Sequence, residues 1–89
     1  MYKYSLDYIA KLNRVNNYHP INKLNKTKIG KNLRIIRKRL NLTQRDIANE
    51  CAISQTTYSN YEKGYYLIST MTLYTICKNH KISMDEILG

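Results

Sequence analysis

From Ile29 to the C-terminus, the chain repeats one local pattern, in which a capping residue precedes a short stretch with apolar residues at helical spacing. Ile29, Leu33, Ile36 and Leu40 follow the i, i+4, i+7, i+11 spacing that places them on one face of an α-helix. The spacing predicts a helix over 29–40, which Asn41 ends. The alternation of apolar and polar residues that is typical of a strand is absent from residues 29–89, so an all-α fold is expected.

Four further helix starts carry residues whose side chains favour the N-cap. Thr43 is followed three residues later by Asp46, which is a capping box with Asp in the place of Glu or Gln. The remaining starts are expected at Ser54, at Ser69 or Thr70, and at Ser83, and Gly64 is expected to cap the end of the helix over 55–63. The sequence therefore predicts a bundle of five short helices without strands.

The basic residues are concentrated in one half of the chain. Residues 1–41 hold eleven basic residues and one acidic residue, whereas residues 42–89 hold four basic and five acidic residues. A cationic block of this kind indicates a polyanionic partner, nucleic acid first and an anionic membrane surface second. No apolar run is long enough to span a membrane and no signal peptide is recognisable, so we expect a cytoplasmic protein without a membrane partner.

Cysteine and histidine are sparse and widely spaced. Cys51 and Cys77 each fall within a helical apolar pattern, and neither His19 nor His80 lies at a spacing that would complete a metal site. We therefore expect two reduced thiols in the core, no metal and no cofactor. Clusters typical of catalysis and glycine-rich phosphate loops are also missing, which argues against an enzyme.

Residues 1–28 differ in composition and form a separate predicted region, a basic arm ahead of a domain over 29–89. Ser5 is a plausible cap for a short helix over 5–15 that would carry Leu6, Ile9 and Leu12. Three interpretations remain open: an arm that wraps DNA through the lysines of 23–28, a contact for a partner or a second copy, and a disordered basic tail.

The stretch from Thr43 to Gly64, TQRDIANECAISQTTYSNYEKG, carries the functional signal. It predicts two short helices joined by a tight turn, with Tyr58 and Tyr61 of the second helix facing inward. The outward face of that second helix carries Gln55, Thr56, Thr57, Ser59, Asn60 and Lys63. Apart from Lys63, these are amides and hydroxyls, whereas an ordinary solvated face carries Glu, Lys and Arg. Amides and hydroxyls suit the base edges of a DNA major groove, although an ordinary solvated face is the competing interpretation.

Residues 29–88 resemble the Cro/C1-type, or Xre-like, helix-turn-helix family of phage repressors. The resemblance runs from IGKNLRIIRKRLNLTQRDIANECAISQTTYSNYEKG to TLYTICKNHKISMDEIL and covers about two thirds of the chain. It implies a five-helix, lambda-repressor-like bundle with a basic N-terminal extension. Family positions that contact base edges correspond to Gln55, Thr56 and Asn60. Positions near the phosphate backbone correspond to Gln44, Thr57, Ser59 and Lys63, and a structural ion pair corresponds to Arg37 and Glu62.

Three departures from the family pattern are visible. Ala52 stands in the turn where the family usually has Gly, so a left-handed backbone there would cost about 1 kcal/mol. Tyr58 and Tyr61 replace aliphatic residues. His80 occupies a position where Leu is common and is expected to be a half-buried packing residue.

These features together predict a sequence-specific regulator of transcription, expected to be a repressor. Lys31, Arg34, Lys38 and Arg39 would attract phosphates, and the polar helix would discriminate between bases. One such domain covers few base pairs, so a homodimer on a palindromic operator is expected, and the resemblance implies a dimer surface on the last two helices. The alternative is an antitoxin that uses the same domain to regulate its own gene and residues 1–28 to bind a toxin.

Overall fold

The computed structural model describes residues 24–89, and these residues form five helices and no strand. The helices are α2 (Lys26–Arg39), α3 (Gln44–Glu50), α4 (Gln55–Glu62), α5 (Thr70–His80) and α6 (Met84–Leu88). The predicted all-α, five-helix fold is confirmed. The possible helix over 5–15 and Lys23 lie outside the described residues.

The first of these helices begins earlier than the apolar spacing predicts. α2 starts at Lys26 rather than at Ile29, because the Asn25 side chain accepts hydrogen bonds from the backbone N–H groups of Thr27 (2.9 Å) and Lys28 (3.1 Å). Lys26 and Lys28, predicted to belong to a basic arm, therefore lie in the first turn of α2. The apolar pattern missed this turn because its residues are all exposed.

The other helix starts agree with the predicted caps. Thr43 and Asp46 form the reciprocal capping box of α3, with Thr43 N donating to Asp46 Oδ2 (2.8 Å) and Asp46 N donating to Thr43 Oγ1 (3.0 Å). Ser54, Ser69 and Ser83 cap α4, α5 and α6 through their hydroxyl oxygens, and Ser83 also forms a capping box with Glu86. These local bonds explain why such short helices have defined ends.

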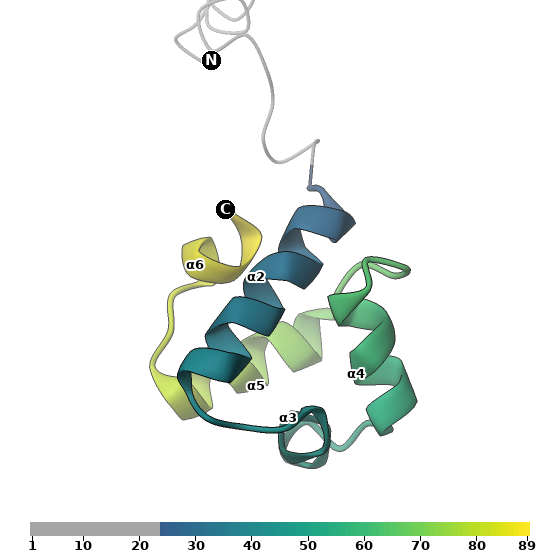
Figure 1. The fold of residues 1–89 in the computed structure, drawn as a ribbon. Coiled ribbons are helices and arrows are strands. Elements are labelled where there is room, and N and C mark those ends of the chain that lie inside the picture. Colours follow the sequence, from purple (N-terminus) through teal and green to yellow (C-terminus); the bar gives the residue numbers. More distant parts are fainter. Residues whose placement is uncertain (1–23) are drawn as a thin grey trace, which may run out of the picture.

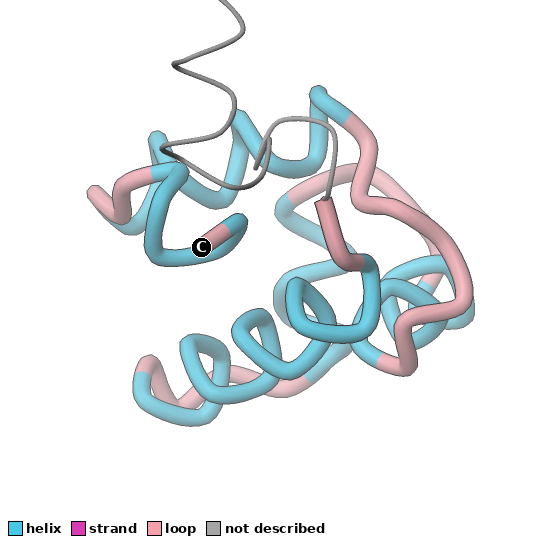
Figure 2. Tube along the Cα trace, turned by 90° about the horizontal axis from the view of Figure 1, so that it is seen from above, coloured by secondary structure: helices cyan, strands magenta, loops and turns pink. Residues whose placement is uncertain are grey.

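The helices pack around one apolar core. α2 runs through the middle of the molecule with α4 along one side and α6 along the other, whereas α3 crosses at one end and α5 lies behind (Figure 1). Figure 2, which looks down on this arrangement, shows the helices grouped in one bundle. The most deeply buried side chains come from every helix: Ile29, Leu33, Ile47, Tyr58, Ile76 and Ile87.

Two close approaches define the position of α4. A Cβ atom at Gly30 of α2 would lie 2.5 Å from the carbonyl oxygen of Glu62 and 2.6 Å from that of Tyr61, so the two backbones meet where no side chain fits. Ala48 of α3 is also buried and small. α4 is thus held between α2 and α3 at short range.

The turn between α3 and α4 contains a left-handed residue at the predicted place. Ala52 has φ 56°, a backbone conformation that favours glycine. Ile53 N donates to Ala48 O (3.0 Å), which closes the turn despite that conformation. The chain therefore keeps the turn geometry of a helix-turn-helix with alanine in the strained position.

Candidate nucleic-acid interface

The outward face of α4 opens onto a polar hollow at the surface. It is lined by Gln44 from α3 and by residues at and after the start of α4: Gln55, Thr56, Ser59, Asn60 and Lys63. All of these were predicted as DNA contacts, from residues up to nineteen positions apart in the sequence. The fold brings amide, hydroxyl and ammonium groups together at one site.

The opposite face of α4 explains why this polar face points outward. Tyr58 and Tyr61 are buried in the core and anchor the helix on its inner side. With the tyrosines inside, helical geometry turns Gln55, Ser59 and Asn60 toward solvent. The replacement of aliphatic residues by tyrosine thus leaves the orientation of the helix intact.

Thr57 lies on α4 but does not line the hollow. Its backbone N–H donates to Ser54 Oγ (3.0 Å), and the Ser54 hydroxyl donates to Thr57 Oγ1 (2.9 Å). Thr57 is therefore part of the cap of α4. Its own hydroxyl hydrogen is not used in that pair and can still be donated to an acceptor.

Glu62, in the last turn of α4, is the acceptor of a small hydrogen-bond network. Arg37 Nε lies 2.6 Å from Glu62 Oε2, and Arg37 NH2 lies 3.1 Å from Oε1. Gln44 Nε2 also donates to Glu62 Oε1, at 3.0 Å. The side chains of Arg37 and Glu62 are only 13% and 4% exposed, so this bidentate pair is largely shielded from water.

The network shifts the pKa values of its members in consistent directions. Burial by itself would raise the pKa of Glu62, but hydrogen bonds from Arg37, Gln44 and Tyr58 outweigh burial and lower it. The hydrogen bond with Glu62 raises the pKa of Arg37, and burial raises the pKa of Tyr58. The carboxylate of Glu62 is therefore ionised and Tyr58 is protonated at neutral pH.

Gln44 connects this network to the hollow. One N–H of its side-chain amide is engaged with Glu62, which orients the group, and the second N–H remains for another acceptor. Arg37 NH1 donates to Leu42 O (3.0 Å) and so ties the end of α2 to the loop before α3. The three helices around the hollow are therefore fixed to one another through Glu62.

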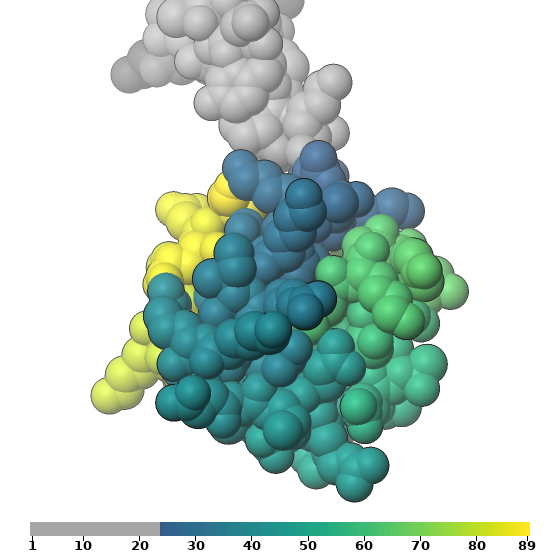
Figure 3. Space-filling model, viewed as in Figure 1, coloured from purple at the N-terminus to yellow at the C-terminus, as the bar shows by residue number. Residues whose placement is uncertain are grey.

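The predicted cationic residues Lys31 and Arg34 do not line the hollow. Both are exposed on α2, and Arg34 comes one turn after Gly30, the point at which α2 touches α4. Figure 3 shows α2 and α4 side by side on one face of the molecule. Arg34 thus lies on the side of α2 that faces α4.

Two contacts at the ends of helices were not predicted from the sequence. His80 Nε2 lies 2.7 Å from Glu50 Oε1, so the half-buried His80 of α5 has a polar partner on α3. Lys26 Nζ donates to Tyr65 O (3.4 Å), across thirty-nine positions of sequence. For the contact of Lys26 with Tyr65, the sequence offers one signal, which is Asn25. Its tendency to cap a helix places Lys26 at the start of that helix.

Among residues 24–89, no group of His, Cys, Asp and Glu has an arrangement that could hold a metal ion, and no helix is long and apolar enough to cross a membrane. Cys51 and Cys77 are free thiols, and burial raises the pKa of Cys51 to about 11, so this thiol stays protonated near neutral pH.

Comparison with known proteins agrees with this geometry. Residues 30–88 match the family described as "Helix-turn-helix domain". The antitoxin PezA of Streptococcus pneumoniae is 38% identical over 61 residues, which cover 68% of this chain and 39% of the antitoxin. The cryptic phage CTXphi transcriptional repressor RstR of Vibrio cholerae is 40% identical over 62 residues, which cover 70% of this chain and 55% of the repressor.

The chain thus spans about half the length, or less, of these two relatives. No solved structure matches it significantly. The family match extends over most of the chain and over all five helices of the structure, including the α3–α4 pair that carries the polar hollow. The chain belongs to the Xre-like, Cro/C1-type helix-turn-helix family of DNA-binding regulators.

Proposed function

We propose that this protein is a transcriptional repressor that binds a palindromic operator as a homodimer, with α4 in the major groove. The observation that carries the proposal is the polar hollow, where amides and hydroxyls converge on a helix that packs against both α2 and α3. Gln55, Thr56 and Asn60 are assigned to base edges, because amides make paired contacts to adenine and a threonine methyl packs on thymine.

The phosphate contacts are assigned to the rim of the same surface. Gln44 keeps one amide N–H for a phosphate, and Thr57 and Ser59 offer hydroxyls. Lys63 at the end of α4, and Lys31 and Arg34 on the neighbouring α2, supply positive charge. These contacts orient the domain and contribute affinity that does not depend on sequence.

We assign the contact between the two copies of the proposed dimer to α5. Met71 and Tyr74 lie one turn apart on α5, and Leu67 lies in the loop before that helix; all three are exposed. An exposed apolar patch of this kind is typical of an interface. A two-fold dimer through this patch would place two copies of α4 on successive turns of one face of DNA.

The test is selection of bound duplexes from a random pool at near-physiological salt, followed by affinity measurements on the selected site. We expect the wild type to select a palindrome, and Gln55→Ala to relax the preference at one position of each half-site, at a cost of about 1–3 kcal/mol. Asn79→Ala, an exposed amide on α5, is the matched control and should leave the consensus unchanged.

The cationic rim is tested with the double variant Lys31→Ala, Arg34→Ala. It should weaken all duplexes alike and lower the slope of log affinity against log salt by about two. Lys78→Ala on α5 is the control. Binding without any consensus in the wild type would contradict the proposed function.

A second candidate function follows from the antitoxin relative. In that case residues 1–28 would bind a toxin, and the helix-turn-helix would regulate the gene pair. Expression of the protein encoded by the neighbouring gene should then arrest growth, and co-expression of this chain should restore it. Growth that is indifferent to both would exclude this alternative.

A further inference from the structure

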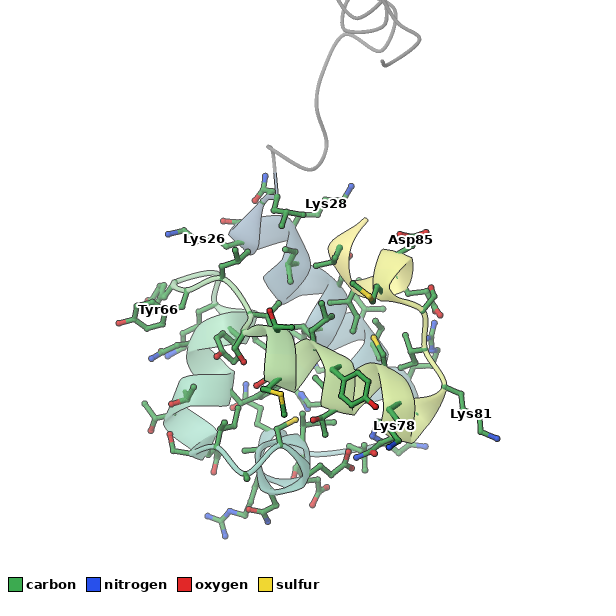
Figure 4. All side chains as sticks on the ribbon, turned by 180° about the vertical axis from the view of Figure 1, so that it is seen from behind. Lys26, Lys28, Tyr66, Lys78, Lys81 and Asp85 are labelled. Atoms are coloured by element: carbon green, nitrogen blue, oxygen red, sulfur yellow. The ribbon has the colours of Figure 1, made fainter. Side chains whose placement is uncertain are left out.

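Two exposed tyrosines follow α4 directly. Tyr65 and Tyr66, in the loop between α4 and α5, are each 60% exposed, although large aromatic side chains usually bury most of their surface. Figure 4 shows Tyr66 projecting from the edge of the molecule next to Lys26, whereas Lys78, Lys81 and Asp85 lie on the opposite edge. These rings have no role in the core or in the hollow.

Their backbone is nevertheless held in a defined conformation. Gly64 has φ +76° and is buried, and a Cβ there would lie 2.8 Å from Thr27 Cα, so the loop is pressed against the first turn of α2. Tyr65 N donates to Asn60 O (3.0 Å), and Lys26 Nζ donates to Tyr65 O (3.4 Å). The tyrosines are thus presented at a fixed place beside the end of α4.

The surroundings of the rings are positively charged. Lys63 Nζ lies 5.7 Å from the centre of the Tyr65 ring, and Lys26 joins the same loop. The exposed carboxylates of residues 24–89 belong to Asp46 and Glu50 on α3 and to Asp85 and Glu86 at α6. The carboxylate nearest in sequence, Glu62, is buried against Arg37. Among the described residues, the charged side chains placed at this loop, Lys26 and Lys63, are both cationic.

We propose that Tyr65, Tyr66, Lys26 and Lys63, here named the tyrosine–lysine cluster, bind the phosphodiester backbone of one DNA strand next to the bases contacted by α4. Lys63 belongs both to the polar hollow and to the cluster, so the two surfaces are continuous. The tyrosine hydroxyls donate to phosphate oxygens and the rings lie against the sugars. The cluster holds the register of α4 along the groove.

This inference rests on the proposed function, and its test separates the two. The probe is the duplex selected by the wild type, used intact and with single phosphates replaced by uncharged methylphosphonates. Tyr66→Phe and Tyr65→Phe keep the rings and remove the hydroxyls. We expect each variant to bind about three- to tenfold more weakly, with an unchanged consensus. Lys81→Ala, at an exposed residue on the opposite edge of the molecule, is the control and should bind as the wild type.

The effect of methylphosphonates distinguishes a phosphate contact from a role of the tyrosines in folding alone. In the wild type, one flanking methylphosphonate should weaken binding, and in Tyr66→Phe or Tyr65→Phe the same replacement should have little further effect. Additive losses at every flanking phosphate would overturn the cluster as a phosphate site. Unchanged affinity in both phenylalanine variants, with a consensus that still depends on Gln55, would overturn it while leaving the proposed function intact.

A protein partner for these rings is the competing outcome. It would appear as normal DNA affinity of Tyr66→Ala together with a lower oligomeric state than the wild type in sedimentation. That result would assign the tyrosines to contacts between copies and would overturn the DNA assignment.

Discussion

At the scale of single residues, Glu62 links α4 to two neighbouring helices beside the proposed interface. It accepts from Arg37 on α2 and from Gln44 on α3 while it sits in the last turn of α4. Removing one member of a shielded pair leaves the other charge without compensation, which costs far more than the loss of an exposed pair. The Arg39–Glu86 pair, with side chains 58% and 46% exposed, provides the exposed comparison within the same molecule.

We expect Glu62→Gln to lower the free energy of unfolding by about 2–4 kcal/mol, because Arg37 loses its anionic partner. Arg39→Ala, which removes the exposed pair, should cost less than about 1 kcal/mol. Urea unfolding followed by circular dichroism measures both. Equal midpoints for the two variants would show that shielding of the Glu62 network contributes nothing.

Comparison of the wild type with Glu62→Gln also gives the pH dependence of the free energy of unfolding. The folded-state pKa of Glu62 lies below its ordinary value of 4.5, so its contribution is fully present above that value and is lost as the pH falls through the lowered pKa. The gap in stability between the wild type and Glu62→Gln should therefore be constant from pH 7 to about pH 5 and narrow below that. A gap that widened toward acid would contradict the assigned direction.

At the scale of elements, the α3–α4 turn determines how α4 is oriented relative to α3. Ala52 takes a left-handed backbone there, as do Asn41 and Lys81 at two other helix ends, and only Gly64 among these four positions carries the residue that adopts it without strain. The turn is nevertheless closed by the hydrogen bond from Ile53 N to Ala48 O. The fold thus tolerates strain in the loop on which the orientation of the recognition helix depends.

We expect Ala52→Gly to stabilise the protein by about 0.5–1 kcal/mol, since relief of the strained backbone exceeds the entropy that glycine adds to the unfolded chain. Ala48→Gly, in the middle of α3, should destabilise by about 1 kcal/mol or more, because it lowers helix propensity and leaves a buried gap. Thermal unfolding compares the two. Destabilisation by both would mean that the turn is not strained in solution.

At the scale of the whole molecule, function depends on which faces remain uncovered. The exposed apolar residues of α5 and the polar face of α4 belong to different helices, so in the proposed complex one would bind a second copy while the other meets DNA. The strongly basic first half of the chain includes Lys31 and Arg34 of α2, the helix that packs against α4.

We expect Met71→Glu to shift the protein toward monomer in sedimentation and to weaken operator binding about tenfold or more, because a charge in a desolvated interface opposes association. Met71 is 71% exposed, so the substitution should leave the fold of the single chain unchanged. Ile35→Glu, at a residue that is 62% exposed on α2, is the matched control and should keep the oligomeric state. A dimer that survives Met71→Glu would move the proposed interface away from α5.

The helical class, the starts of α3 to α6 and the polar face of α4 could be predicted from the sequence, because caps and apolar periods act between residues at most a turn or two apart. The sequence also indicated the left-handed turn at Ala52. It placed the start of α2 too late, since the exposed first turn carries no apolar signal, and the assignment of residues 1–28 as an arm stays a prediction.

Only the tertiary structure shows which groups that are distant in the sequence lie in contact. The hydrogen bond of Gln44 to Glu62, the pairing of His80 with Glu50 and the approach of Lys26 to Tyr65 join residues eighteen to thirty-nine positions apart. Such contacts depend on how helices pack, and helix packing depends on the close approach of α2 and α4 at Gly30, which no local pattern encodes. For that reason the polar residues of α4 were visible in the sequence, whereas the tyrosine–lysine cluster beside them became visible only in the folded molecule.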